Sequence, residues 1–78
     1  MKKYIKINKN DNVAIVLEPM KKGEIITDGD EDTILAEDID KGHKTALTDI
    51  KEGGNIIKYG MPIGKAVKDI AAGEWIHT

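Results

Sequence analysis

The sequence contains no cysteine, serine, arginine or phenylalanine, and the first three of these absences narrow what the chain can do. Without cysteine there is no disulfide, no thiolate metal site and no thiol nucleophile. Without serine there is no Ser-His-Asp catalytic triad. All twelve basic residues are lysines, so no planar guanidinium is available to donate two parallel hydrogen bonds to a phosphate or a base. We therefore expect no nucleic-acid partner.

Long hydrophobic runs are also missing. The longest, VAIVL at 13–17, is far shorter than the roughly 20 residues that span a bilayer. No long apolar stretch follows the lysines at the start, so that segment does not read as a signal peptide. With 78 residues and a net charge of −2, the chain predicts one small, soluble, cytoplasmic domain without a membrane partner. Its stability should be on the order of 5 kcal/mol.

One short pattern occurs four times: PMKKG at 19–23, DIDKG at 38–42, DIKEG at 49–53 and DIAAG at 69–73. In each copy an Asp or Pro precedes an apolar residue, two further residues follow, and a glycine closes the pattern. A glycine in this place can adopt a positive φ without steric cost, as a tight turn requires. We predict such turns at Gly23, Gly42, Gly53 and Gly73.

The other residues of the pattern have predictable roles. The apolar residue of each turn should point inward; these residues are Met20, Ile39, Ile50 and Ile70. Asp38, Asp49 and Asp69 should accept hydrogen bonds from nearby backbone N–H groups. The glycine spacings are unequal, so we expect one turn chemistry used repeatedly rather than a solenoid with a fixed period.

Short β-like runs lie between the turns: IKI at 5–7, VAIVL at 13–17, EIIT at 24–27, TALTDI at 45–50, NIIKY at 55–59 and EWIHT at 74–78. VAIVL suits a strand buried on both faces. The segment 63–70 has apolar residues at helical spacing, but it is short and flanked by Pro62, so strand is favoured over helix. The sequence predicts an all-β domain, a small and partly closed barrel-like fold.

The acidic stretch TDGDEDT at 27–33 predicts an exposed, solvated loop. The alternative is a calcium loop, because Asp28, Asp30 and Asp32 alternate. The glycine and the glutamate that such a loop needs further along are replaced by Thr33 and Ile39, which disfavours calcium.

The candidates for chemistry are few. His43 follows a turn glycine and precedes Lys44, a pairing suited to gripping an anion or meeting a metal. Lys58 and Tyr59 precede a second tight turn, in which Gly60 should take an unusual φ. The last predicted strand should carry Trp75 and Ile76 into the core, and His77 lies near its end. For each histidine a structural role is the competing interpretation, and no catalytic set is complete.

Three longer motifs carry a resemblance to a known family. GHKTAL at 42–47, IIKYGMPIGKA at 56–66 and DIAAGEWIHT at 69–78 together resemble the N-terminal SAF domain of the altronate dehydratase and galactarate dehydratase family. The resemblance covers residues 11–78, and we expect a single SAF domain over 1–78. The short turn pattern alone is shared by SAF domains generally, whereas the three motifs together are typical of sugar-acid dehydratases.

The resemblance implies a β-clip fold and a hydro-lyase reaction. Such an enzyme removes water from a sugar acid such as altronate to give a 2-keto-3-deoxy acid, with a divalent iron or manganese ion. It also implies a large catalytic domain or subunit as partner, without which this chain should be inactive. By the same match, His43 and His77 are candidate catalytic residues, and Lys44, Lys58 and Tyr59 are candidate substrate-binding residues.

Two alternatives stay open. The chain could be a free-standing SAF module that binds carbohydrate or protein without catalysis. It could also be a folding or homo-oligomerisation domain whose histidines are incidental.

Overall fold

The computed structural model describes residues 2–77, and this part of the chain consists of short strands and turns without a helix. The strands are β1 (Tyr4–Ile5), β2 (Val13–Val16), β3 (Ile25–Asp28), β4 (Glu31–Ile34), β5 (Lys44–Ala46), β6 (Asn55–Lys58), β7 (Met61–Lys65) and β8 (Trp75–Ile76). The predicted all-β class is confirmed. Within residues 2–77, no helix is long and apolar enough to cross a bilayer.

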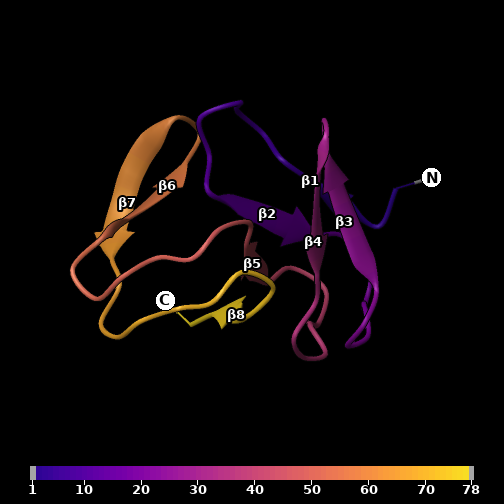
Figure 1. The fold of residues 1–78 in the computed structure, drawn as a ribbon. Coiled ribbons are helices and arrows are strands. Elements are labelled where there is room, and N and C mark those ends of the chain that lie inside the picture. Colours follow the sequence, from indigo (N-terminus) through magenta and orange to yellow (C-terminus); the bar gives the residue numbers. More distant parts are fainter. Residues whose placement is uncertain (1, 78) are drawn as a thin grey trace.

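The strands form one central sheet and two hairpins. The antiparallel sheet has the order β1-β2-β5-β8, and the hairpins β3–β4 and β6–β7 lie on either side of it (Figure 1). We call β3–β4 the first hairpin and β6–β7 the second hairpin. Strand β5 pairs with β2 on one side and with β8 on the other, so it connects β8 to the rest of the sheet.

The four glycine turns are confirmed, and the structure shows that they interlock in pairs. Their φ angles are +92° at Gly23, +86° at Gly42, +83° at Gly53 and +88° at Gly73. Met20 and Ile39 exchange two backbone hydrogen bonds, and Ile50 and Ile70 do the same. All four of these apolar side chains are buried, as predicted.

The aspartates of the pattern do accept backbone hydrogen bonds, but the donors belong to the opposite turn of each pair. The bonds join Asp38 to the N–H of Lys22 at 2.9 Å, Asp49 to that of Ala72 at 2.9 Å, and Asp69 to that of Glu52 at 2.8 Å. Pro19 stands where the first turn would need its aspartate. Among the described residues, no side chain therefore accepts from the Lys41 N–H, the fourth equivalent donor.

These contacts reveal a repeat larger than the turn. Gly23 bonds to Leu35 and Gly42 to Val16 in the first pair, and Gly53 to Ala66 and Gly73 to Ala46 in the second. Thirty residues separate Gly23 from Gly53, and thirty-one separate Gly42 from Gly73. The chain is therefore two copies of one unit of about thirty residues, each enclosing a hairpin. Sequence analysis recognised the turn but not this unit.

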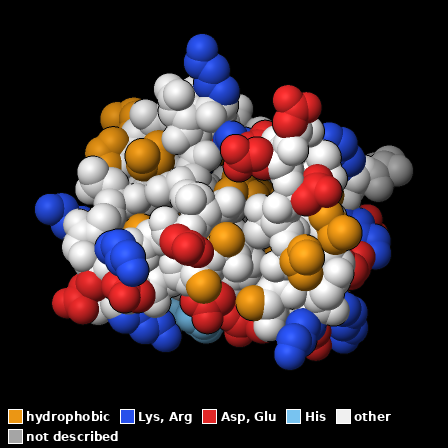
Figure 2. Space-filling model, in the orientation of Figure 1, with side chains coloured by type: hydrophobic (Ala, Val, Ile, Leu, Met, Phe, Trp, Pro, Cys, Tyr) orange, Lys and Arg blue, Asp and Glu red, His pale blue; other side chains and the backbone are white. Residues whose placement is uncertain are grey.

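The core follows the same division. One cluster of buried residues belongs mainly to the second half: Val13, Ala46, Ile50, Ile56, Ala66, Ile70 and Ile76. The other belongs to the first half: Ala14, Val16, Met20, Ile26, Leu35 and Ile39. Burial of these aliphatic side chains stabilises the fold by roughly 1.5–3 kcal/mol for each large one. Figure 2 shows that further hydrophobic side chains reach the surface over both hairpins.

The acidic segment 27–33 is a hairpin rather than the predicted loop. Its strands pair Ile26 with Thr33, and both side chains are buried, while a tight turn at Gly29 (φ +62°) reverses the chain. Two-residue periodicity with one buried residue on each strand was enough to form strands, although the composition looked loop-like. Within residues 2–77 no group of three or more acidic, histidine or cysteine side chains could hold a metal ion.

Several strand boundaries differ from prediction, among them that of β1, which covers Tyr4–Ile5 rather than 5–7. The strand expected over 63–70 is β7, which ends at Lys65, because Ala66 starts a turn segment that bonds to Gly54. The helix alternative is wrong. In the run 13–17, Leu17 is exposed and leaves the sheet, and β5 stops at Ala46 rather than continuing to Ile50.

Candidate functional site

The two histidines of the chain lie against the same tryptophan. The ring centroids of His43 and Trp75 are 4.4 Å apart with the planes tilted by 58°. Those of Trp75 and His77 are also 4.4 Å apart, and these rings are stacked at 24°. The pairing of β5 with β8 brings them together, because Thr45 lies opposite Trp75.

A hollow of about 290 Å³ opens beside these rings. It is lined by Gly42, His43, Lys44, Trp75, Ile76 and His77, and we call it the histidine hollow. Three predicted site residues, His43, Lys44 and His77, therefore share one cavity. Its lining residues include one lysine and two histidines but no acidic residue, so it suits an anion.

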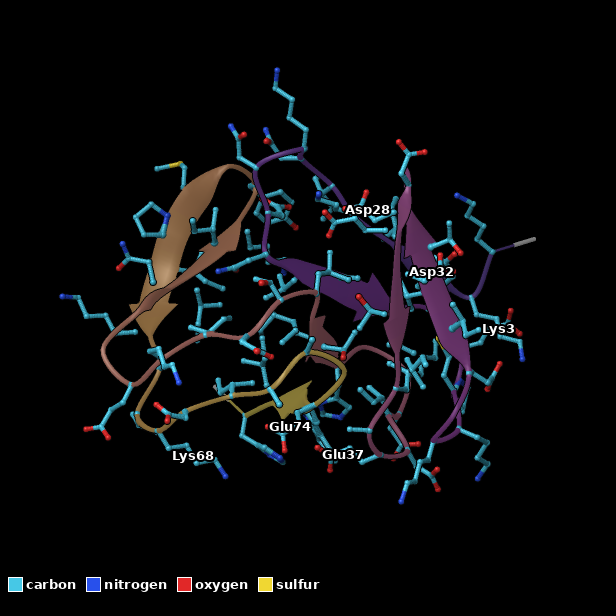
Figure 3. All side chains as sticks on the ribbon, in the orientation of Figure 1. Lys3, Asp28, Asp32, Glu37, Lys68 and Glu74 are labelled. Carbon is cyan, nitrogen blue, oxygen red and sulfur yellow. The ribbon has the colours of Figure 1, made fainter. Side chains whose placement is uncertain are left out.

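Two hydrogen bonds between distant residues hold the backbone around Trp75, next to the hollow. The Trp75 N–H donates to a Glu37 carboxylate oxygen at 3.0 Å, and the wholly buried Thr45 hydroxyl donates to the Glu74 carbonyl oxygen at 3.1 Å. Figure 3 shows Glu37 and Glu74 at the same end of the molecule, beside β8. Sequence analysis missed Glu37, because its partner is distant in the chain and no local motif marks it.

Trp75 also differs from expectation. Sequence analysis placed it in the core together with Ile76. Ile76 is buried, but Trp75 is half-exposed and lines the histidine hollow. Its ring also borders an apolar pocket of about 240 Å³ beneath Ile56 and Ile70. Trp75 thus forms one wall of the site. Its contact with both histidines depends on the pairing of β5 with β8, which the sequence alone does not reveal.

Lys44 sits in an unfavourable place for a charge. Partial burial lowers the pKa of Lys44 below its usual value, and the nearby Lys58 ammonium lowers it further. Neither lysine forms a salt bridge with a carboxylate of the described residues. An anion bound here would offset both effects by supplying the missing opposite charge.

Lys58 and Tyr59 belong to the second hairpin and do not line the histidine hollow. The Lys58 ammonium lies 4.9 Å from the centre of the Tyr59 ring. Tyr59 is 58% exposed and has a positive φ of +59°, next to Gly60 at +74°, so the two residues form the tip of the hairpin. The unusual φ at Gly60 is confirmed, and the substrate-binding role of Lys58 and Tyr59 stays a prediction.

A resident metal does not fit the described residues alone. His43 and His77 supply two imidazoles, but no third ligand accompanies them within residues 2–77. Iron or manganese sites need more donors than this. Any such ion in a complete enzyme would therefore depend mainly on ligands from outside this chain.

Comparison with known proteins decides the family. The family model described as "Altronate/galactarate dehydratase SAF domain" matches residues 2–78. The chain belongs to this family. It is 48% identical over 75 residues to altronate dehydratase of Escherichia coli, covering 96% of this chain and 15% of the relative. It is also 48% identical over 78 residues to altronate dehydratase of Bacillus subtilis, covering 100% and 16%.

The same SAF domain occurs in a protein of very different length. The chain is 33% identical over 71 residues to (2R)-sulfolactate sulfo-lyase subunit alpha of Chromohalobacter salexigens, covering 83% of this chain and 76% of the relative. The chain thus spans only about one sixth of the dehydratases but most of this alpha subunit. Segments similar to this chain form either a small part of a long protein or most of a small subunit.

Proposed function

We propose that this SAF domain forms one wall of the substrate site of a sugar-acid dehydratase. The substrate would be an aldonate or aldarate, and the product a 2-keto-3-deoxy acid. The observation that carries the proposal is the histidine hollow, which is lined by His43, Lys44 and His77 and by no acidic residue. The family relatives named altronate dehydratase support the class of reaction.

The reaction asks for groups of the kind found in this hollow. A proton must leave the carbon next to the carboxylate, and a hydroxyl must leave the following carbon as water. Positive charge near the carboxylate makes that proton more acidic, and Lys44 can supply it. An imidazole at His43 or His77 can hold or deliver a proton at the departing hydroxyl. The remaining machinery, including any iron or manganese ion, would lie in the larger catalytic part.

Lys44→Met should weaken altronate binding without lowering the stability of the domain. Removing the ammonium should weaken altronate binding about tenfold, equivalent to about 1.4 kcal/mol. The same change should leave the melting temperature equal or higher, because a lysine with a lowered pKa is a charge that burial disfavours. Altronate binding is measured through the fluorescence of Trp75, the single tryptophan, with galactitol as an uncharged control. Equal responses to altronate and galactitol would argue against a carboxylate site.

The function itself is tested by complementation. Escherichia coli altronate dehydratase lacking its matched N-terminal segment serves as the catalytic part, and this chain is added to it. We expect the wild-type chain to raise dehydration of altronate, and His43→Ala and His77→Ala chains to restore at least tenfold less activity. These histidines are exposed, so the variants should fold.

Two results would count against the proposal. The first is full activity of the catalytic part without any SAF domain. The second is equal restoration by the wild-type and both histidine variants, which would favour a structural role. Altronate binding without any gain in activity would favour a free-standing carbohydrate-binding module.

A further inference from the structure

The second hairpin exposes hydrophobic side chains on a strand that has no covering layer. All five residues of β7 are exposed to solvent. Met61 is 65% exposed and Ile63 47%, and the neighbouring Val67 is 84% exposed. Figure 2 shows hydrophobic side chains gathered over this hairpin, at the left of the view. A cluster of this kind on a small domain marks a contact surface more often than a chance exposure.

The first hairpin is an internal control for this observation. The two hairpins occupy equivalent places in the two copies of the repeat. At their tips, Asp28, Glu31 and Asp32 of the first hairpin correspond to Lys58, Met61 and Pro62 of the second. The fold therefore accepts charged residues at these positions, and stability of the domain does not require the hydrophobic ones.

The second hairpin also carries an extra hydrophobic residue. The pairing of β6 with β7 shifts between Ile56 and Ile57, which pair with Gly64 and Pro62 and leave Ile63 as a bulged residue. This one-residue insertion explains why the repeat lengthens from thirty to thirty-one residues in its second part. Bulges of this kind redirect side chains at functional edges. Here the bulge adds an isoleucine to the exposed face.

One edge of the second hairpin is covered and the other is not. The Asn12 side chain accepts from the Ile57 N–H at 2.8 Å and donates to the Asn55 carbonyl oxygen at 2.9 Å, so it covers the edge of β6 that faces away from β7. Within residues 2–77, β7 pairs with β6 alone. The open edge and the exposed side chains thus lie on the same strand.

We propose that the β7 face, formed by Met61, Pro62, Ile63 and Val67, docks the domain onto the large catalytic part of the dehydratase. The residues 55–68 contain three lysines and no acidic residue. The docking surface on the partner is therefore apolar at its centre and acidic at its rim. Most of the length of the dehydratase relatives lies outside the segment that matches this domain, and that remaining part is the partner we propose.

A second copy of this chain fits the β7 face less well. A two-fold symmetric contact would place the patch that carries Lys58, Lys65 and Lys68 against the same patch of the other copy and bring like charges together. A head-to-tail contact between the basic second hairpin and the acidic first hairpin would not give a closed dimer, and would build rings or open chains of molecules. The separate alpha subunit among the relatives shows instead that such a domain also exists apart from a longer chain.

The test measures binding, not catalysis, so it is independent of the proposed role of the histidine hollow. Escherichia coli altronate dehydratase without its matched segment is immobilised, and this chain is passed over it. Met61→Glu should weaken binding at least tenfold, because a carboxylate would enter an apolar centre with an acidic rim. Ile34→Glu on the first hairpin is the matched control, since Ile34 is 63% exposed and Met61 65%. It should bind within about twofold of wild type, a change of less than about 0.5 kcal/mol.

The outcomes are distinct. Selective loss with Met61→Glu supports the proposal, and retention of binding by His43→Ala separates docking from chemistry. The proposal is overturned if the wild-type chain does not bind, or if Ile34→Glu loses as much affinity as Met61→Glu. It is also overturned if both variants bind as tightly as wild type. Concentration-dependent dimers in sedimentation, abolished by Met61→Glu, would assign this face to a second copy instead. Circular dichroism confirms that each variant is folded.

Discussion

Gly73→Ala is expected to abolish cooperative folding. Gly73 is buried with φ +88°, and a Cβ there would overlap the Ile34 carbonyl oxygen and lie 3.0 Å from the Ala36 nitrogen. Both neighbours are backbone atoms, which cannot swing aside as a side chain can. The left-handed φ alone costs about 1–2 kcal/mol, and displacing the backbone of residues 34–36 adds about 1–3 kcal/mol or more. The sum is comparable to the whole stability expected of a domain of this size, about 5 kcal/mol.

Gly23→Ala is the matched control for this prediction. Gly23 has the same turn position and a φ of +92°, but nothing lies within 4 Å of its added Cβ. It should lose only about 1–2 kcal/mol and keep a cooperative transition. Urea unfolding followed by circular dichroism compares the two variants. A Gly73→Ala chain that unfolds cooperatively with the stability of Gly23→Ala would contradict the close packing described for that turn.

Asp11→Ala should lower the free energy of unfolding by about 2–4 kcal/mol. The Asp11 side chain is 5% exposed, and its carboxylate accepts from the Gly60 N–H at 2.7 Å and from the Asn8 N–H at 3.0 Å. It therefore ties the N-terminal segment to the tip of the second hairpin, where Tyr59 has the unfavourable φ of +59°. Removing it leaves these donors without their acceptor and the strained turn without its clamp. Asp30→Ala, at the exposed tip of the first hairpin, should cost under about 0.5 kcal/mol.

The same carboxylate predicts a loss of stability in acid. Burial alone would raise the pKa of Asp11, but hydrogen bonds from the backbone of Gly60, Asn8 and Tyr59 outweigh it and hold that pKa below the usual 3.8. The unfolded chain therefore binds the proton more readily than the folded chain. Stability from Asp11 is fully present well above pH 4 and is lost as the pH falls through the lower folded value.

Melting temperatures at neutral pH and at about pH 3 test whether Asp11 makes the domain less stable in acid. Wild type should lose more stability between the two conditions than Asp11→Asn, whose amide does not titrate. Hydrogen bonds from backbone N–H groups likewise lower the pKa of Glu24 and Asp38, so the wild-type profile sums several groups. Only the difference between the two proteins reports on Asp11. Parallel profiles would show that its hydrogen bonds do not favour the charged form.

Local chemistry explains which parts of the fold were predictable. The glycines of the four turns and their inward apolar residues followed from a short pattern, because φ preference and burial act within five residues. The first hairpin was missed because its composition is that of a loop, and only the burial of Ile26 and Thr33 against the core makes it a pair of strands. The two-copy repeat was missed because its second half carries the extra Ile63.

Only some residues of the candidate site were predictable from the sequence. His43, Lys44 and His77 could be chosen from their side-chain chemistry, and the pairing of β5 with β8 places them around one hollow. Trp75 and Glu37 could not, because they are joined by a hydrogen bond from the Trp75 backbone N–H to the Glu37 carboxylate, between residues far apart in the sequence. Asp11 was equally hidden, since its acceptor role involves a turn near residue 60.

Pro19 gives the turn at His43 a distinct character. In the second pair of turns, both aspartates cap the opposite backbone, whereas in the first pair only Asp38 does so. Among the described residues the Lys41 amide, two positions before His43, has no side-chain acceptor. That amide should exchange with solvent faster than its three equivalents, because less must open to expose it. We therefore expect the backbone at the edge of the histidine hollow to open more readily than the other three turns, without opening of the buried core.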